Sequence, residues 1–360
     1  MSSSELPPEL VVEILKRLPV RSLRRFRRVS RSWRSTIDDP DFVALHLKHS
    51  ALDASNWHLA CLERCCPSRT LCFLFSDESP AISKIEVPFV VPTSCYRFVG
   101  SCNGLICITE VSGDGFCQSM YLWNLFTRKH KMVPQSRPEQ HRTSRRVLGF
   151  GFDTGSKDYK IVRILQYPND HHRSGVEIYS LNTDSWRSLE RELPPLTGSG
   201  PAVFLNGNLH WFVSNGNRSI VLFNVASEMF AEMALSKKLL RIVIVSKAVV
   251  LSVLNDLLAV CTLRREAAAG HLEPYSIVSV WVMKEYGMPE SWTRLVRYSF
   301  KVRAEVKGFA GFTRNGELLM VTNDDDDGLF SWNPTTGKCT NLPLAIRPEL
   351  VAVVESLVSP

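Results

Sequence analysis

Two groups of residues could bind a metal ion, and each lacks part of what a metal site needs. Cys61, Cys65 and Cys66 lie close together, but neither paired CxxC knuckles nor a spaced histidine pair accompanies them. His171 and His172 are adjacent, so in an extended strand they point to opposite faces and could not readily share an ion. The pattern indicates reduced, mostly buried thiols and no bound metal.

The candidates for catalysis are also incomplete. The run Asp324 to Asp327 lacks the spaced ligands and distal glutamate of a calcium loop, so it predicts a solvated turn. The glycines of GFGFDTGS, from Gly149, precede neither a helix nor a phosphate-binding lysine. His210 beside Trp211 is more typical of a packed histidine, and no serine nucleophile motif is present. The sequence therefore predicts a non-catalytic protein without a cofactor.

The stretch from Leu6 to Leu47 carries two apolar stripes with helical spacing. Pro8 suits the first turn of a helix, Pro19 ends it, Ser30 can cap a new helix, and Pro40 closes the set. We predict three short helices. The stripes consist of Leu10, Val11, Ile14, Leu15 and Leu18, then Leu23, Phe26, Val29, Trp33 and Ile37. A unit of about forty residues barely buries its own core, so these stripes suggest a helical partner, with a self-packed subdomain as the alternative.

The positive charge of the chain is concentrated in the same helices. Net charge is +7, and the residues from Ile14 to Ile37 include no acidic residue. The basic residues there are Lys16, Arg17, Arg21, Arg24, Arg25, Arg27, Arg28, Arg31 and Arg34. A solvated helix face, a patch that steers an acidic partner, and a nucleic-acid surface would all explain them. A nucleic-acid-binding fold would spread basic and aromatic residues over a reading surface, so nucleic acid is the weakest of the three.

Short apolar runs separated by glycine, asparagine and proline follow the helices and predict an all-β domain. Turns of the form NxxT or NxxS begin at Asn124, Asn182, Asn224 and Asn333, at intervals of 58, 42 and 109 residues. An aromatic residue precedes each turn, namely Trp123, Tyr179, Phe223 and Trp332. The longest interval is about two periods, so we expect a degenerate copy near Trp281, with a longer loop.

A second series supports the same repeat. Asn103 with Gly104, Asn206 with Gly207, and Asn315 with Gly316 each precede an apolar run, as hairpins with two-residue turns require. A period of about fifty residues is close to that of kelch-type propeller blades, although no glycine doublet recurs. We therefore predict a propeller of six blades, with an irregular β domain as the alternative. An oxidase or hydrolase acting at a propeller channel would leave the helices unexplained.

The motif LPPELVVEILKRLPVRSLRRFRRVSRSWRSTI closely resembles the F-box, the adaptor-binding module of Skp/cullin/F-box ubiquitin ligases. The resemblance implies that matching positions face the adaptor or the core of the module. These positions are Leu6, Pro7, Leu10, Ile14, Leu15, Leu18, Pro19, Leu23, Phe26, Val29 and Trp33. We expect Leu10, Ile14, Leu23 and Trp33 to be the buried anchors. Two positions depart from the family, because plant members often carry an apolar residue at Arg24 and a small one at Arg28.

The motifs VGSCNGLICI, YLWNLFTRKHKMVP, LGFGFDTGSKDYKIVRIL and VEIYSLNTDSWRSL resemble the F-box-associated domain of plant F-box proteins, including the F-box/kelch-repeat and S-locus types. This resemblance implies a substrate receptor of an E3 ubiquitin ligase. Its helices would bind a Skp-type adaptor and through it a cullin scaffold, and its propeller would bind a protein target for ubiquitination and degradation. The alternative is an adaptor-independent protein whose basic helices bind an acidic protein or nucleic acid.

These patterns divide the chain into four segments. We expect an F-box at 1–50, a connector at 51–68, a propeller at 69–345 and a tail at 346–360. The start of the chain does not resemble a signal peptide, which favours the cytosol or nucleus. The apolar stretch from Leu239 to Leu263 is interrupted by Arg241, Lys247 and Asp256, and its β-branched residues favour buried strands over a membrane span. The target itself cannot be read from loops such as Pro134 to Arg146, Pro168 to Ser174 and Arg264 to Pro274.

Overall fold

A computed structural model describes residues 6–66, 69–76, 79–89, 95–111, 117–136, 145–167, 170–196, 202–213, 219–266, 275–300, 306–322, 328–345 and 349–360. The chain divides into two compact units. The first contains Met1–Val133 together with Val351–Pro360, and the second contains Pro134–Leu350. The ends of the chain therefore belong to the same unit.

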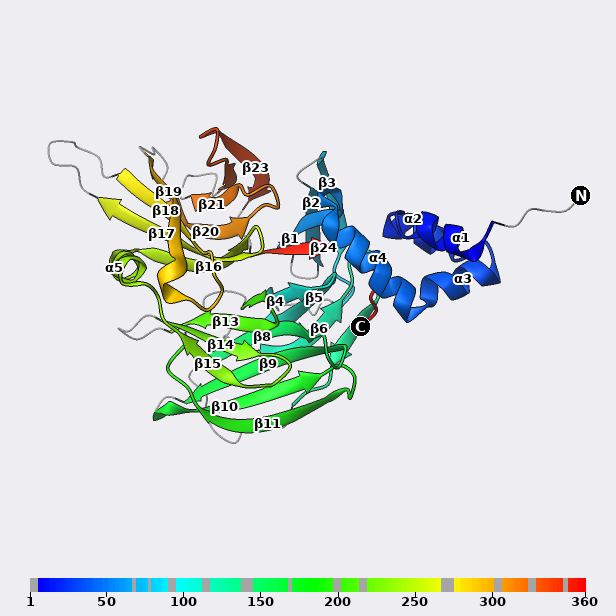
Figure 1. The fold of residues 1–360 in the computed structure, drawn as a ribbon, viewed down its shortest axis with the longest axis horizontal. Helices are drawn as coiled ribbons and strands as arrows, with labels where there is room; N and C mark the ends of the chain where they lie inside the picture. Colours follow the sequence, from blue (N-terminus) through cyan, green and yellow to red (C-terminus); the bar gives the residue numbers. More distant parts are fainter. Residues whose placement is uncertain are drawn as a thin grey trace, which may run out of the picture. The chain divides into compact units, whose positions relative to one another are not determined.

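The first unit contains the three predicted helices and a fourth that was not predicted. They are α1 (Pro8–Leu15), α2 (Val20–Phe26), α3 (Arg31–Asp38) and α4 (Pro40–Leu52), followed by the short η1 (Ala54–Asn56) (Figure 1). Ser30 caps α3, since its side chain accepts the Trp33 N–H at 3.1 Å. Asp39 caps α4 in the same way, and Pro40 occupies its first turn. Pro40 thus ends α3 but also begins a fourth helix, because proline is tolerated at the first helical position.

Two four-stranded sheets complete the first unit. One has the order β24-β1-β2-β3 and the other β4-β5-β6-β7. The strands are β1 (Trp57–Cys66), β2 (Arg69–Ser76), β3 (Ser79–Glu86), β4 (Cys95–Cys102), β5 (Leu105–Val111), β6 (Cys117–Trp123), β7 (His130–Val133) and β24 (Leu350–Val354). Figure 1 shows the last strand, in red, beside β1. The segments expected to be a connector and a tail therefore contribute the paired strands β1 and β24.

Four more sheets form the second unit. The first two contain β8 (Arg145–Asp153), β9 (Asp158–Tyr167), β10 (Asp170–Ser180) and β11 (Ser185–Glu192), then β12 (Val203–Leu205), β13 (Asn208–Phe212), β14 (Ile220–Asn224) and β15 (Phe230–Met233). The last two contain β16 (Ala248–Leu254), β17 (Leu257–Glu266), β18 (Tyr275–Met283) and β19 (Trp292–Phe300), then β20 (Val306–Phe312), β21 (Leu318–Thr322), β22 (Gly328–Trp332) and β23 (Cys339–Ala345). With the first two sheets they make the predicted six-bladed β-propeller, in which the blades bury their apolar residues against their neighbours within each unit.

The turn between the third and fourth strands repeats among the blades. Trp123 pairs with His130, Phe223 with Phe230 and Trp332 with Cys339, always seven residues apart. The asparagine after each aromatic accepts backbone N–H groups two or three residues ahead. These turns confirm the predicted repeat in three blades. The fifth blade has the longer loop expected after Trp281, since Met283 pairs with Trp292.

The assignment of Asn182 to this repeat was wrong. Tyr179 pairs with Trp186 at the same seven-residue separation, so the residue that starts the turn is Ser180. The Ser180 hydroxyl accepts the Thr183 N–H at 3.3 Å. It takes the role that the side-chain oxygen of asparagine has in the other turns. Asn182 instead donates its backbone N–H to Asp158 at 2.9 Å. A serine side chain can accept the same backbone N–H as an asparagine side chain. The pattern therefore selected the nearby Asn182 instead of Ser180 as the first residue of the turn.

Two of the three Asn-Gly pairs form the expected two-residue hairpin turns. Asn103 and Gly104 have φ of 53° and 80° between paired Cys102 and Leu105, and Asn206 and Gly207 have φ of 50° and 72°. Both residues of such a turn need positive φ, which asparagine and glycine tolerate. The third pair lies in a longer loop, because Phe312 pairs with Leu318.

The stretch from Leu239 to Leu263 forms a helix followed by two strands. Helix α5 (Lys237–Val245) is capped by the Ser236 hydroxyl, which accepts the Leu239 N–H at 3.3 Å. Strands β16 and the start of β17 take up the rest. The expectation of strands alone therefore missed α5, whose leading Ser236 is a good N-cap. No helix in the described part of the chain is long and apolar enough to cross a membrane.

Candidate functional site

The helices of the first unit have a small core of their own. Leu15, Leu23, Ile37 and Phe42 are buried together, with Leu23 at 0% exposure. Phe26 and Trp33 are half-buried against this core and meet edge to face, with ring centroids 5.2 Å apart. Four of the positions expected at the adaptor or the core thus stabilise the helices themselves. Leu15 and Leu23 are enclosed, so neither offers a side chain to a partner.

A second set of apolar residues on the same helices is exposed. Leu10 and Ile14 are each 50% exposed and lie four residues apart, on one face of α1. Leu6, just before this helix, is 57% exposed, and Val29, after α2, is 66% exposed. These four side chains have the chemistry of a protein-binding surface, because each exposes apolar area to water. We call Leu6, Leu10, Ile14 and Val29 the exposed apolar set.

The remaining predicted positions shape the helices. Pro7 and Pro19 are exposed and precede α1 and α2 as their N-cap residues. Leu18 is partly buried against the helical core, and its carbonyl lies 3.0 Å from His46 Nε2. Burial lowers the pKa of His46, with the Leu18 carbonyl opposing that shift, so the neutral ring is favoured in the folded helices.

Several basic residues of the helices are held by partners. Asp38 binds Arg27, with its Oδ2 2.7 Å from the Arg27 Nη2, and lies 3.7 Å from Arg34. The hydrogen bond from Arg27 lowers the pKa of Asp38. Arg24 donates to the backbone carbonyl of Phe126, in the β6–β7 turn, at 3.1 Å. The family departure at Arg24 therefore serves a contact within this chain.

Four arginines of the helices have no bound partner within the described residues. Arg21, Arg25 and Arg28 succeed one another at helical spacing along and just past α2, and Arg31 begins α3. All four are exposed. We call them the arginine group. Their charges remain available to an anionic partner, because arginine is always protonated and binds carboxylates in a bidentate manner.

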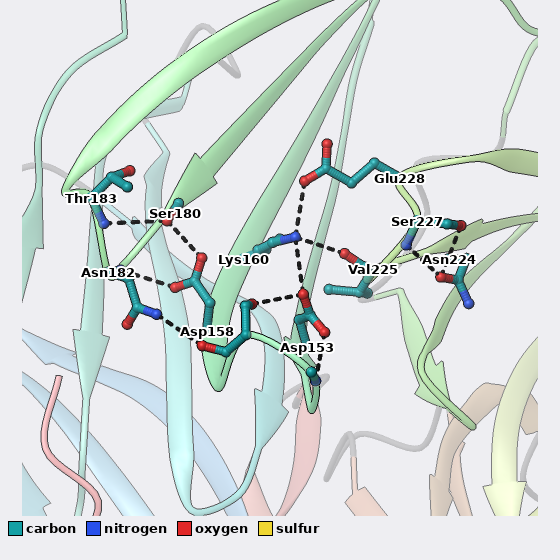
Figure 2. Close-up of polar contacts among 12 residues, drawn as sticks. Asp153, Asp158, Lys160, Ser180, Asn182, Thr183, Asn224, Val225, Ser227 and Glu228 are labelled. Atoms are coloured by element: carbon teal, nitrogen blue, oxygen red, sulfur yellow. Dashed lines mark hydrogen bonds and ion pairs between the residues drawn. The ribbon is translucent and has the colours of Figure 1, made fainter.

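Lysine 160 is the centre of a polar network in the second unit. Figure 2 shows its ammonium group between Asp153 Oδ2 at 3.4 Å, the Val225 carbonyl at 2.9 Å and Glu228 Oε1 at 2.9 Å. The Lys160 residue is 8% exposed, and Glu228 also binds Arg187. The network joins β9 to the β14–β15 turn of the next blade, so it has the chemistry of a structural link.

The loop between β8 and β9 completes the network. Asp153 accepts the Ser156 hydroxyl at 2.7 Å and the Gly155 N–H at 2.9 Å, and the Ser156 bond is the main cause of its lowered pKa. Asp158 accepts the Ser180 hydroxyl at 2.6 Å (Figure 2). Sequence reasoning missed Lys160. Its signal was a lysine within YKIVRIL, a largely apolar stretch of a strand whose first eight residues are buried.

The remaining candidates for chemistry are buried side chains. His210 is buried and contacts the Val203 carbonyl at 2.9 Å and the Tyr286 hydroxyl at 2.7 Å, and burial lowers its pKa. Burial raises the pKa of the thiols of Cys72, Cys102 and Cys261. Among the described residues, no cluster of three or more histidine, cysteine or acidic side chains could hold a metal ion.

Some predicted features cannot be compared with the structure. The run Asp324 to Asp327 lies outside the described residues, as do residues 137–144, 168–169 and 267–274 of the three loops considered for target binding. Nothing is therefore assigned to them.

Comparison with known proteins identifies the family. The F-box domain matches residues 3–45, and the F-box associated beta propeller domain matches residues 76–313. An F-box/kelch-repeat protein of Arabidopsis thaliana is 27% identical to this chain over 362 residues, covering 94% of this chain and 90% of its own length. The F-box protein CPR1 of the same plant is 28% identical over 329 residues, covering 85% of this chain and 75% of its own.

A helical F-box followed by a six-bladed propeller makes this chain an F-box protein with a propeller domain. This chain belongs to the family with the F-box-associated β-propeller domain. An F-box implies binding of a Skp1-type adaptor, and proteins of the F-box family are generally non-catalytic adaptor subunits.

Proposed function

We propose that this protein is a substrate receptor of a Skp/cullin/F-box E3 ubiquitin ligase. Its F-box, at 1–50, binds the adaptor and through it the cullin scaffold, and its propeller binds a protein target. Catalysis then occurs by proximity, because the receptor raises the effective concentration of target lysines near a ubiquitin-charged enzyme that other subunits supply. Such a complex acts in the cytosol or the nucleus.

The observation that carries this proposal is the exposed apolar set on the F-box helices. Leu10 and Ile14 remain half-exposed beside a helical core that is already filled by Leu15 and Leu23. A partner that covers them removes apolar surface from water without disturbing that core. The buried positions contribute to adaptor binding by holding the helices that present this set.

Recovery of a Skp1-type adaptor by the purified protein tests the proposal. We expect wild type to retain the adaptor, and Leu10→Ala with Ile14→Ala to weaken binding at least about tenfold, since each truncation removes an apolar anchor. Met229→Ala is the control, because Met229 is 60% exposed but lies in the propeller. Equal adaptor recovery from all three proteins would refute the proposal.

A second function is favoured by one observation, the arginine group. Its four unpaired charges could bind an acidic protein or nucleic acid without an adaptor. This function predicts binding that weakens steeply with salt and is lost when Arg25 and Arg28 are replaced by glutamine. It fails if adaptor binding persists at high salt while a DNA or RNA oligonucleotide is not retained.

A further inference from the structure

A short segment after β24 lies between the F-box helices and the sheets of the first unit. We call Glu355, Ser356, Leu357 and Val358 the strap. The strap continues the pairing of the last strand with the start of the first, since the Glu355 N–H donates to the Asn56 carbonyl at 2.9 Å. From there the side chains of Glu355 and Leu357 contact the helices, whereas the backbone and Ser356 contact the second blade.

The strap supplies what helix α2 lacks at its start. Pro19 provides no side-chain cap, and α2 has no acidic residue in its first turn. Glu355 Oε2 accepts the N–H of Val20 at 3.0 Å and brings a negative charge to the N-terminal end of the helix. Leu357 packs against the helical core, which includes Leu23. The strap is thus part of the F-box fold, although it lies more than 300 residues from α2 in the sequence.

The strap is also held by the turns of the second blade. Asn124 Nδ2 donates to the carbonyls of Ser356 at 2.9 Å and Val358 at 2.7 Å, and Asn124 is fully buried. Ser356 packs tightly on Gly104, where an added Cβ would lie 2.3 Å from the Ser356 Cβ. Glycine at this position therefore allows both the positive φ of the hairpin and the close approach of the strap.

The equivalent asparagines in other blades show why Asn124 is available. Asn224 Nδ2 donates to Asn208, and Asn333 Nδ2 donates to Glu317, each at 3.1 Å within its own blade. Both acceptors directly follow the glycine of the preceding hairpin. In the second blade that position is the apolar Leu105, so the amide of Asn124 has no acceptor there and donates to the strap.

We propose that the strap is a positioning device that holds the F-box helices in one orientation relative to the first two blades. Arg24 reinforces it, because its guanidinium binds the same β6–β7 turn. Without the strap, the Arg24 contact and the chain between α4 and β1 would remain to tie the helices to the sheets. The inference rests on the proposed function for its purpose, since a receptor with a fixed orientation presents its target at a defined distance from the adaptor.

The distance between two nitroxide side chains, measured by pulsed electron spin resonance, tests the device. Orthogonal incorporation at exposed Ser35 in α3 and exposed Met132 in β7 avoids the ten native cysteines. Asn124→Asp keeps the oxygen that caps the turn but removes the amide that binds the strap. We expect this variant and deletion of residues 355–360 to broaden the distance distribution to roughly twice its width in the full-length protein.

Asn224→Asp is the matched control, because it makes the same change in a turn that does not touch the strap. It should leave the distribution unchanged. A narrow distribution in both Asn124→Asp and the deletion overturns the positioning role, and helical circular dichroism identifies a deletion variant whose helices have unfolded. Adaptor affinity is measured separately on wild type. Its absence would refute the proposed function without altering the distance result.

Discussion

The propeller and the F-box helices differ in how far their apolar side chains are exposed to water. In the propeller, strand residues such as Val162 and Val278 are 0% exposed, because neighbouring blades cover them. In the helices, Leu10 and Ile14 remain half-exposed beside a small core that includes Leu15 and Leu23. The difference teaches that the blades bury their apolar faces within the chain, whereas the helices leave apolar surface for another protein.

Charge follows the same division. Lys160 of the propeller is buried and bound on three sides by oxygen atoms. Arg21 and Arg28 of the helices are exposed and have no bound partner among the described residues. A buried charge needs an ion pair or hydrogen bonds within the protein, because it has lost its contact with water. An exposed charge is solvated by water and needs no partner in the same chain.

The largest effect should come from breaking the propeller network. Lys160→Met leaves Asp153 without its buried counter-charge, so we expect the free energy of unfolding to fall by about 3–5 kcal/mol. Urea unfolding followed by circular dichroism measures it. Lys238→Met, at an exposed position of α5, should change stability by less than about 0.5 kcal/mol. If the two variants unfold alike, Lys160 is no structural link.

The next effect should be confined to the helices. Leu23→Ala leaves a cavity in their small core, which should cost about 2–5 kcal/mol and expose the amides of α1 to α3 to hydrogen exchange. Strands β8 to β23 should keep their protection. Uniform loss of protection across the chain would show that helices and propeller unfold together, which would contradict the division drawn above.

An exposed apolar residue should behave in the reverse manner. Val29→Asp should leave the melting temperature nearly unchanged, because Val29 is 66% exposed, yet weaken adaptor binding by about tenfold. Calorimetric titration of a Skp1-type adaptor measures it, with Met132→Asp in β7 as the control. A large loss of stability with unchanged affinity would place Val29 in the fold instead of the interface.

The smallest expected effect is a dependence of stability on pH, in both the F-box helices and the propeller. Burial lowers the folded-state pKa of His46 in α4 and of His210 in β13. As pH falls below about 6.5, the unfolded chain binds protons first, so stability is complete above that pH and decreases below it. Hydrogen exchange at pH 7.5 and 5.5, corrected for intrinsic rates, should show acid-sensitive protection in both elements.

A single substitution separates the two contributions. His46→Leu should abolish the acid sensitivity of α4 and leave that of β13 intact. His130→Gln, at an exposed position of β7, is the control and should change neither. Undiminished acid sensitivity of α4 in His46→Leu would assign it to another group.

The sequence by itself determined the helical stripes, the capping Ser30 and a repeat that leads to six blades. These features are local, because a turn residue or a cap acts within a few positions of itself. It also identified the F-box positions as a set. It could not separate Leu10 from Leu23, since both lie on apolar stripes and only packing shows which one the core encloses.

Only the tertiary structure decided the features that join distant residues. The pairing of β24 with β1, the role of Glu355 at α2 and the contact of Arg24 with Phe126 each link segments about 100 or more residues apart. No spacing rule predicts them, because their partners meet only after the blades have formed. The same physical reason explains why Asn124 differs from the equivalent Asn224. Both asparagines make the same turn with the side-chain oxygen, but the residue that packs beside each one decides what its side-chain NH2 group binds.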